Sequence, residues 1–418
     1  MTDVREAPEG VKQQAVKLSP VLIGVGFAVL CASWMLNAMD RQVFYPLLPQ
    51  IREELGFSLV ESGFLATSFT LGLAIAGFLA GFLVDRLSRK TIVLGSVLVF
   101  SLGTGLVAIS QGFWDMTAYR LLSGIGEGVQ ATALYAIIGA FFFHRRAFAA
   151  GFVGVAFGAG IFLGPLVGVP FATEWGTWRA PFILFALLGL VMALLISVFV
   201  KRDMSEAAAG RAGVDDPAAF DFMPTGTLNR NTAVLGLGAA LAGIVFYGYL
   251  GLYPTFLTEQ LGFDPGQSSL AVAMGGLGAM LALLFGWFGD RFPQKWVLLV
   301  SFAGTALVAW PMYTTATEPI LQYVLSFLVG AFGSGGLFTN ISTALQRSVR
   351  PERVGRGQGI FVLTYYVAAA FSGTLFGTLV GGLGWSGAGM VQIVGVSIVG
   401  ALLMLLVDTR QMIRKVRA

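Results

Sequence analysis

Long apolar stretches separated by short polar segments run through most of this chain. A helix needs about 20 mostly apolar residues to cross the hydrocarbon core of a bilayer. Twelve stretches meet that requirement, at residues 20–48, 59–84, 91–110, 114–141, 147–170, 179–200, 231–258, 268–288, 296–315, 319–345, 357–381 and 385–408. Membrane β-strands would instead alternate apolar and polar residues in short segments. The pattern therefore predicts an all-α membrane protein with twelve transmembrane helices.

One polar connection is much longer than the others and separates six stretches from six. It covers residues 201–230, so we expect two six-helix bundles at 20–200 and 231–408, with tails at 1–19 and 409–418. The first tail is polar, and no small-residue cleavage site follows a short apolar region. The first stretch is therefore expected to be a retained helix and not a signal peptide.

The composition argues against the usual soluble classes of protein. Hydrophobic residues make up 56% of the chain and charged residues only 11%, whereas roughly a quarter of a soluble domain is charged. A single cysteine, Cys31, excludes an intramolecular disulfide, and the lone His144 argues against a metal site. The sequence contains no nucleophile–base pattern and no phosphate-binding loop. We therefore expect no enzyme activity, no metal and no cofactor.

The distribution of basic residues predicts the orientation in the membrane. Of the 26 lysines and arginines, 22 lie in the two tails and in the loops on the same side as the tails. By the positive-inside rule, both termini are expected to be cytoplasmic. The net charge of +4 then reflects topology and not nucleic-acid binding. We expect a multi-pass protein of the inner (plasma) membrane that works as a monomer.

A loop motif occurs once in each half of the chain. Residues 81–90 read GFLVDRLSRK and residues 286–295 read GWFGDRFPQK, at an offset of 205 residues. The two halves therefore look like parallel repeats, which is one way in which secondary transporters are built.

With its twelve stretches and long central connection, the sequence resembles the major facilitator superfamily over essentially its whole length. The G-x-x-x-D-R-x-x-R-K motif of that superfamily is present at Gly81, Asp85, Arg86, Arg89 and Lys90, and its second copy keeps Gly286, Asp290, Arg291 and Lys295. The segment from Arg120 to Gly128 also matches a superfamily signature, R-x-x-x-G-x-G-E-G. The resemblance implies a carrier that exposes one central site alternately to the two sides. It also implies that the loop motif latches one conformation, although its arginines could serve only to set the topology.

Two branches of the superfamily look nearest to this chain, and a third pattern matches in part. Asn37, Asp40 and Arg41, together with the glycine-rich segment around Glu127, are similar to the anion:cation symporter family of organic anion/proton cotransporters. The same residues also resemble spinster-like lipid transporters. Gly164 and Pro165 are similar to a pattern of drug/proton antiporters, with Val169 in place of its final glycine. Helix packing or a kink is the alternative interpretation of this Gly-Pro pair. The resemblance favours proton-coupled symport of a small organic anion, such as a carboxylate. The alternatives are lysolipid transport and drug/proton antiport.

Four ionisable residues inside the apolar stretches, Asp40, Arg41, Arg120 and Glu127, carry the functional argument. A charge at the bilayer centre costs about 2.5–3.5 kcal/mol or more, so such residues are expected to face a water-filled cavity or one another. Asp40, Arg41 and Arg120 could alternatively reach the headgroups, but Glu127 is too short and too central. Arg120 and Glu127 are seven residues apart and share one helix face.

These four charges sum to zero when all are ionised. Protonation of one carboxylate would leave a net charge of +1, which matches a monoanion that enters together with the proton. We expect Arg41 to bind the substrate and either Asp40 or Glu127 to carry the proton, with Arg120 in the same proton-coupling group. Asn37 shares a helix face with Arg41.

The second half offers hydroxyl, amide and aromatic groups in place of charges. The candidate substrate-binding residues are Asn37, Arg41, Tyr45, Glu127, Tyr247, Asn340, Tyr365 and Tyr366. Each tyrosine could alternatively have a packing or interfacial role. Asn340 is a stronger candidate, because an amide in hydrocarbon needs a partner.

Overall fold

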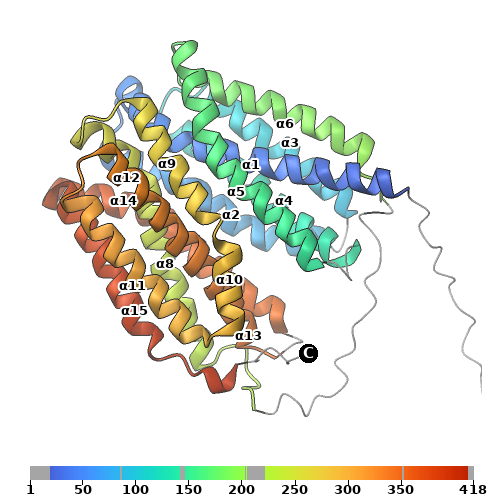
Figure 1. The fold of residues 1–418 in the computed structure, drawn as a ribbon. Helices are drawn as coiled ribbons and strands as arrows, with labels where there is room; N and C mark the ends of the chain where they lie inside the picture. The colour runs from blue at the N-terminus through green and yellow to red at the C-terminus, as the bar shows by residue number, and fades with distance from the viewer. Residues whose placement is uncertain are drawn as a thin grey trace, which may run out of the picture.

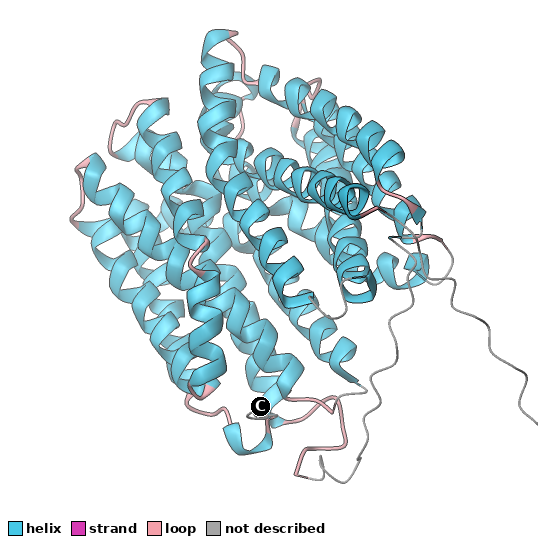
Figure 2. Cartoon of the chain, turned by 45° about the vertical axis from the view of Figure 1, so that its right-hand side comes forward, coloured by secondary structure: helices cyan, strands magenta, loops and turns pink. Residues whose placement is uncertain are grey.

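The structure is a computed structural model that describes residues 19–84, 87–141, 146–202, 204, 222–350 and 353–412. Within these ranges the chain forms helices joined by loops, and no strand is present (Figure 2). Eleven helical segments of the described chain are long and apolar enough to cross a membrane. The expectation of an all-α membrane protein is therefore confirmed.

The first half of the chain contributes six long helices, coloured blue to green in Figure 1. They are α1 (Pro20–Leu55), α2 (Leu59–Val84), α3 (Arg89–Val107), α4 (Phe113–Phe141), α5 (Arg146–Glu174) and α6 (Arg179–Phe199). Within this half, α4 packs between α2 and α3, while α1 packs against α5. This packing places the middle of α1 close to the middle of α4, where the four ionisable residues lie.

The second half lies beside the first, and several of its helices are interrupted (Figure 1). Its α-helices are α8 (Arg230–Thr255), α9 (Pro265–Ala279), α10 (Ala282–Arg291), α11 (Gln294–Thr314), α12 (Pro319–Val329), α13 (Thr339–Arg347), α14 (Val354–Ala388) and α15 (Val396–Met404). The π-helical segments η3 (Phe256–Gln260), η4 (Gly330–Phe338) and η6 (Gly389–Gly395) continue or join them, and a 3-10 turn, η7 (Thr409–Gln411), follows. Several of the predicted stretches are therefore composed of two or three elements.

One helix boundary differs from the sequence prediction, while a break in α14 falls in the predicted gap between residues 381 and 385. The first stretch was expected to end at residue 48, but α1 continues through Pro49 to Leu55 and ends at Gly56, whose φ of 71° is favourable for glycine. At the other end of the chain, α14 contains a break at Gly384, with φ 70° and ψ 176°. The break lies within a continuous 49-residue apolar segment, Arg356–Met404.

Among the described helices, the halves meet chiefly where α2 packs against α14, α5 against α9 and α1 against α8. Gly63 of α2 and Gly373 of α14 lie so close that a Cβ on either would overlap the carbonyl oxygen of the other. Close by, the Thr67 hydroxyl donates a hydrogen bond of 2.7 Å to the Ala370 carbonyl across the same seam. At the C-terminal end of α1, Arg52 forms an ion pair with Glu259 of η3.

Candidate functional site

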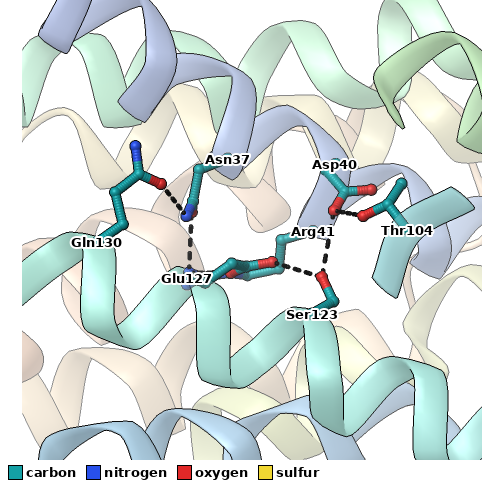
Figure 3. Close-up of polar contacts among 7 residues, drawn as sticks. All are labelled: Asn37, Asp40, Arg41, Thr104, Ser123, Glu127 and Gln130. Carbon is teal, nitrogen blue, oxygen red and sulfur yellow. Dashed lines mark hydrogen bonds and ion pairs between the residues drawn. The ribbon is translucent and has the colours of Figure 1, made fainter. Parts of the chain in front are cut away.

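The central feature of the site is a buried ion pair between α1 and α4. Arg41 donates to one carboxylate oxygen of Glu127, Oε2, from Nε at 2.8 Å and from Nη2 at 2.5 Å (Figure 3). The side chains are only 6% and 2% exposed. Because both charges are removed from water, each depends on the other for compensation.

An amide chain extends from this ion pair along α1 and α4. Arg41 also donates to Asn37 Oδ1 at 3.3 Å, and Asn37 donates to Gln130 Oε1 at 3.0 Å (Figure 3). Gln130 in turn donates to the hydroxyl of Ser33 at 3.1 Å. Every member of this chain is buried, so the guanidinium of Arg41 is held in a defined position by partners on two helices.

Asp40 lies next to Arg41 in sequence but faces a different neighbour. The Thr104 hydroxyl of α3 donates to Asp40 Oδ2 at 2.5 Å. The Ser123 hydroxyl lies between the two carboxylates, 3.5 Å from Asp40 Oδ2 and 3.4 Å from Glu127 Oε1 (Figure 3). In the part of the chain that the structure describes, Asp40 forms no ion pair. The two carboxyl groups therefore have different environments and share one hydroxyl.

Arg120, two helical turns before Glu127 on α4, is held without a carboxylate. Its guanidinium donates to the carbonyl oxygens of Leu65 and Ala66, both at 3.3 Å. It also lies 3.8 Å above the ring centroid of Phe44. No ion pair of Arg120 is found among the described residues. Since Arg120 and Asp40 are 5% and 4% exposed, both are enclosed by protein and do not extend to the headgroups.

Aromatic residues connect the charged cluster to the second half. The ring of Phe69 lies 5.2 Å from the Arg41 guanidinium carbon and 5.0 Å from that of Arg120. The ring centroid of Tyr247, on α8, lies 5.9 Å from that of Phe69. Tyr247 and Tyr366 of α14 are both close enough to Arg41 to interact with its charge. Tyr247 and Tyr366 are thus brought to the cluster from the second half. Tyr365 packs against both, with ring centroids 6.1 Å from Tyr247 and 5.2 Å from Tyr366.

Two buried hydrogen-bond donors near the arginines have no hydrogen-bond partner among the described residues. They are the indole nitrogen of Trp34 and the hydroxyl of Tyr45. Trp34 stacks on Phe157 at 5.4 Å, and Phe157 lies 5.4 Å from the Arg41 guanidinium carbon. Tyr45 is close enough to Arg120 to interact with its charge. A buried donor without a partner is costly, which makes both groups available to a polar ligand.

Asn340 is not part of this cluster. Its amide donates to the carbonyl oxygens of Phe285 at 3.2 Å and Gly336 at 3.0 Å, and its oxygen faces Gly289 of α10. The expectation that this amide needs a partner holds, but the partners are backbone carbonyls of its own half. The bond to Phe285 holds α13 against α10, so the structure does not place Asn340 with the other candidate substrate-binding residues.

The predicted gating motif is only partly covered by the structure. Asp85 and Arg86 lie outside the described residues, while Gly81 is helical in α2 and Arg89 begins α3. Lys90 donates to the carbonyl oxygen of Ser197 at 2.8 Å. In the second copy, the Asp290 carboxylate accepts a hydrogen bond of 2.5 Å from Arg347 at the end of α13.

The cluster includes residues that were not identified from the sequence, among them Phe69, Thr104, Ser123 and Gln130. Two of them carry a detectable signal. Ser123 and Gln130 lie four residues before and three residues after Glu127, and therefore on its helix face. Thr104 and Phe69 come from α3 and α2, and only the packing of those helices brings them to the site.

A bundle of membrane-spanning helices that encloses ionisable residues at its centre is the organisation of a membrane transporter. The chain matches the Major Facilitator Superfamily over residues 30–277 and again over residues 235–417. It therefore belongs to this superfamily of transporters and is not an enzyme. It is a multi-pass protein of the inner (plasma) membrane.

Characterised relatives include transporters of organic acids. The chain is 28% identical over 372 residues to a gentisate transporter of Corynebacterium glutamicum, covering 86% of this chain and 81% of that one. It is 25% identical over 374 residues to a hexuronate transporter of Bacillus subtilis, covering 85% and 87%. Among solved structures, it resembles an inward-facing, unoccupied bacterial homologue of the lysosomal transporter Spinster, with a TM-score of 0.73, 15% identity and coverage of 94% and 97%. This last likeness concerns the fold.

Proposed function

We propose that the protein is a proton-coupled symporter of a small organic anion, with a carboxylate as the preferred substrate. The observation that carries the proposal is the buried Arg41–Glu127 ion pair, beside a second buried arginine, Arg120, that no described carboxylate compensates. The transport of gentisate and hexuronate by relatives supports an organic acid as substrate. The four central charges sum to zero when all are ionised, so a proton on one carboxylate leaves a net charge of +1 that suits such a substrate.

The ion pair provides a route for coupling a proton to the substrate. When Glu127 accepts a proton, Arg41 loses the negative charge that compensates it in the protein interior. A substrate carboxylate can then take the position of Glu127 at the Arg41 guanidinium, so that the loaded site is again neutral. Substrate and proton therefore enter together, and neither leaves an uncompensated charge in a region of low dielectric constant.

Asp40 is the second candidate for the proton. It is buried against Thr104, and the Ser123 hydroxyl lies between it and Glu127. A carboxyl group that is removed from water and lacks an ion-pair partner is the kind of group that can hold a proton. We assign proton coupling to Asp40, Glu127 and Arg120 as one group.

The substrate is proposed to lie between the charged cluster and the tyrosines of the second half. Arg41 binds its carboxylate, and the free donors of Trp34 and Tyr45 are available to its other polar groups. Tyr247 and Tyr366 close the site on the opposite side. A ring or a short chain with hydroxyl groups fits these surroundings, as in aromatic acids and sugar acids.

The membrane topology is proposed to comprise twelve helices with both termini in the cytoplasm. The eleven apolar segments become twelve when Arg356–Met404 is divided at Gly384, because its 49 residues are about twice the length of one crossing. We assign residues 20–200 and 231–408 to two bundles that work as a monomer. The contacts at Gly63–Gly373 and Arg52–Glu259 then lie on the extracellular side and favour a state that opens toward the cytoplasm.

The loop motifs are proposed to act in gating. In the second copy, Asp290 is bonded to Arg347 at the end of a neighbouring helix, which is the type of contact that could latch one conformation. By analogy we assign the same role to Asp85, with Gly81, Arg86, Arg89 and Lys90 around it, and to Arg291 beside Asp290.

Purified protein in proteoliposomes tests the proposed function. With an inward proton gradient, we expect an acidic exterior to stimulate uptake of an aromatic or sugar acid, and a protonophore to abolish that stimulation. Glu127→Gln is expected to lose gradient-driven accumulation while exchange of substrate across the membrane persists. Glu53→Gln, which changes an exposed glutamate of α1, is the matched control and should behave like wild type.

Three other outcomes would change this proposal. Transport of lysolipids in preference to organic acids would identify a lipid carrier. Proton-driven export of cationic drugs would identify an antiporter. Uptake by Glu127→Gln that still responds fully to the proton gradient would remove Glu127 from the coupling group.

A further inference from the structure

An apolar groove lies between α10 and α11, outside the charged cluster. It has a volume of about 500 Å³, and all of its lining residues are apolar. Phe288 of α10, Trp296 and Val300 of α11 and Phe332 of η4 form its walls. Trp296 and Val300 are 54% and 55% exposed. The groove therefore opens on the outer surface of helices that are long and apolar enough to cross a membrane.

The groove follows one side of α10 to the end of that helix. Phe285, Phe288 and Phe292 succeed one another at helical spacing, with ring centroids 6.1 Å apart in both steps. At a rise of 1.5 Å per residue, the seven residues from the first ring to the last span about 10 Å. An elongated apolar groove of this kind suits part of an acyl chain better than a compact polar solute.

Two cations, Arg291 and Lys295, lie next to lining residues of the groove at the end of α10. The Arg291 guanidinium carbon lies 5.4 Å from the Trp287 ring, and Lys295 Nζ lies 5.6 Å from the Trp296 ring. Lys295 donates one hydrogen bond of 2.7 Å to the Leu405 carbonyl, which leaves two of its three donors.

The neighbouring carboxylate does not neutralise these cations. Asp290 is bonded to Arg347 of α13, at 2.5 Å. In the ranges that the structure covers, neither Arg291 nor Lys295 forms an ion pair with a carboxylate. The apolar groove therefore ends at two positive charges, each beside a tryptophan of the kind that lies at membrane–water interfaces.

We propose that the groove binds an anionic phospholipid. One acyl chain lies along the phenylalanines of α10, and the headgroup phosphate lies between Arg291 and Lys295. Basic pockets beside membrane helices recognise anionic headgroups in this manner. A zwitterionic phospholipid offers the same chain without the net negative charge, so selectivity depends on the two cations. The proposal stands independently of the transported substrate.

Quenching of tryptophan fluorescence by brominated lipids tests the site. The protein is reconstituted in phosphatidylcholine nanodiscs that contain increasing fractions of phosphatidylglycerol with dibrominated chains, and the signal of Trp296 is obtained by difference from Trp296→Phe. We expect half-maximal quenching at a roughly tenfold lower fraction than with dibrominated phosphatidylcholine, since each basic residue near a membrane surface strengthens anionic-lipid binding several-fold.

Two variants and a control divide the proposal into its parts. Arg291→Gln with Lys295→Gln should remove the preference for phosphatidylglycerol, whereas Arg230→Gln with Arg356→Gln, which removes two exposed cations elsewhere, should keep it. Val300→Phe fills the groove with an apolar ring and should reduce quenching by either lipid.

Equal quenching by the two lipids in wild type, or an unchanged preference in the first double variant, would overturn the proposal. Unchanged quenching in Val300→Phe would show that no chain occupies the groove.

Discussion

The two halves of this transporter bury polar groups of different kinds. In the first half, the buried polar residues include Asp40, Arg41, Arg120 and Glu127. In the second half, the buried polar side chains that the structure describes are hydroxyls and amides, and none is ionisable apart from tyrosine. The repeated loop motif thus coexists with a clear division of chemistry between the halves.

The hydrogen bonds of the second half show what its polar residues do. Gln322 donates to the carbonyl oxygens of Met312 at 2.8 Å and Ala316 at 2.7 Å, and accepts from Tyr253 at 3.0 Å. Tyr249 and Ser326 share a hydrogen bond of 2.6 Å. These groups use their hydrogen-bonding capacity inside their own half, so they stabilise that half.

The first half leaves its polar groups in a different condition. Its buried charges are an ion pair, Arg41–Glu127, and an arginine, Arg120, that has no carboxylate partner among the described residues. A charge can gain or lose a partner when a proton binds, whereas a neutral amide has no such change to make. The proposed response to protons therefore belongs to the first half, where the buried charges lie.

The largest expected effect comes from breaking the buried ion pair. Arg41→Ala leaves Glu127 buried without its cation, which costs about 3–5 kcal/mol, so we expect lower thermal stability and a loss of uptake of about 100-fold or more. Arg41→Ala combined with Glu127→Gln removes both charges and should recover most of the stability without recovering uptake. Thermal unfolding and proteoliposome uptake measure the two effects. Normal uptake by Arg41→Ala would show that this arginine does not bind the substrate.

An intermediate effect is expected in the amide network of the second half. Gln322→Leu leaves the carbonyl oxygens of Met312 and Ala316 without their donor, at a cost of about 1–3 kcal/mol for each buried group. We expect a lower unfolding temperature, while the dependence of the remaining uptake on pH stays as in wild type. Gln260→Leu, at an exposed glutamine, is the control. A shifted pH dependence in Gln322→Leu would contradict the division between the halves.

The smallest effect is expected at the ion pair that joins the halves. Arg52 and Glu259 are 29% and 37% exposed, and exposed ion pairs contribute about 0–1 kcal/mol. Glu259→Gln should therefore leave thermal stability almost unchanged. It should shift the distance distribution between spin labels at the exposed positions 53 and 315 slightly toward larger values, because one contact between the halves is lost.

Another exposed glutamate provides the control for this comparison. Glu318→Gln removes a negative charge near the start of α12 and should leave the distance distribution as in wild type. All of these labelled proteins carry Cys31→Ser, so that only the two introduced cysteines are labelled. Identical distributions in Glu259→Gln and wild type would show that the Arg52–Glu259 pair does not hold this end closed.

The sequence was sufficient to predict the membrane class of the fold and the identity of the four central charges. Apolar length is a local property, and an ionisable residue in hydrocarbon is conspicuous wherever its helix packs. The limits of α1 were less predictable, because Pro46 and Pro49 are typical of helix ends but lie inside the helix here. The ending depends instead on Gly56.

Partner choice within the site depended on tertiary structure. Asp40 and Arg41 are adjacent in the chain, yet Arg41 pairs with Glu127, 86 residues away, and Asp40 with Thr104, 64 residues away. A helix turns about 100° per residue, so neighbours in sequence face different helices. Asn340 illustrates the same limit, since its need for a partner was predictable but the partner was not.

Hydropathy and composition by themselves determined that this chain is a helical membrane protein with charges at its centre, because both are properties of each segment alone. Only the packing of α1 against α3 and α4 decided which charges are paired, which arginine lacks a carboxylate and which donors remain for a ligand. Those outcomes depend on distances of a few ångströms between segments far apart in the chain, and no local pattern encodes them.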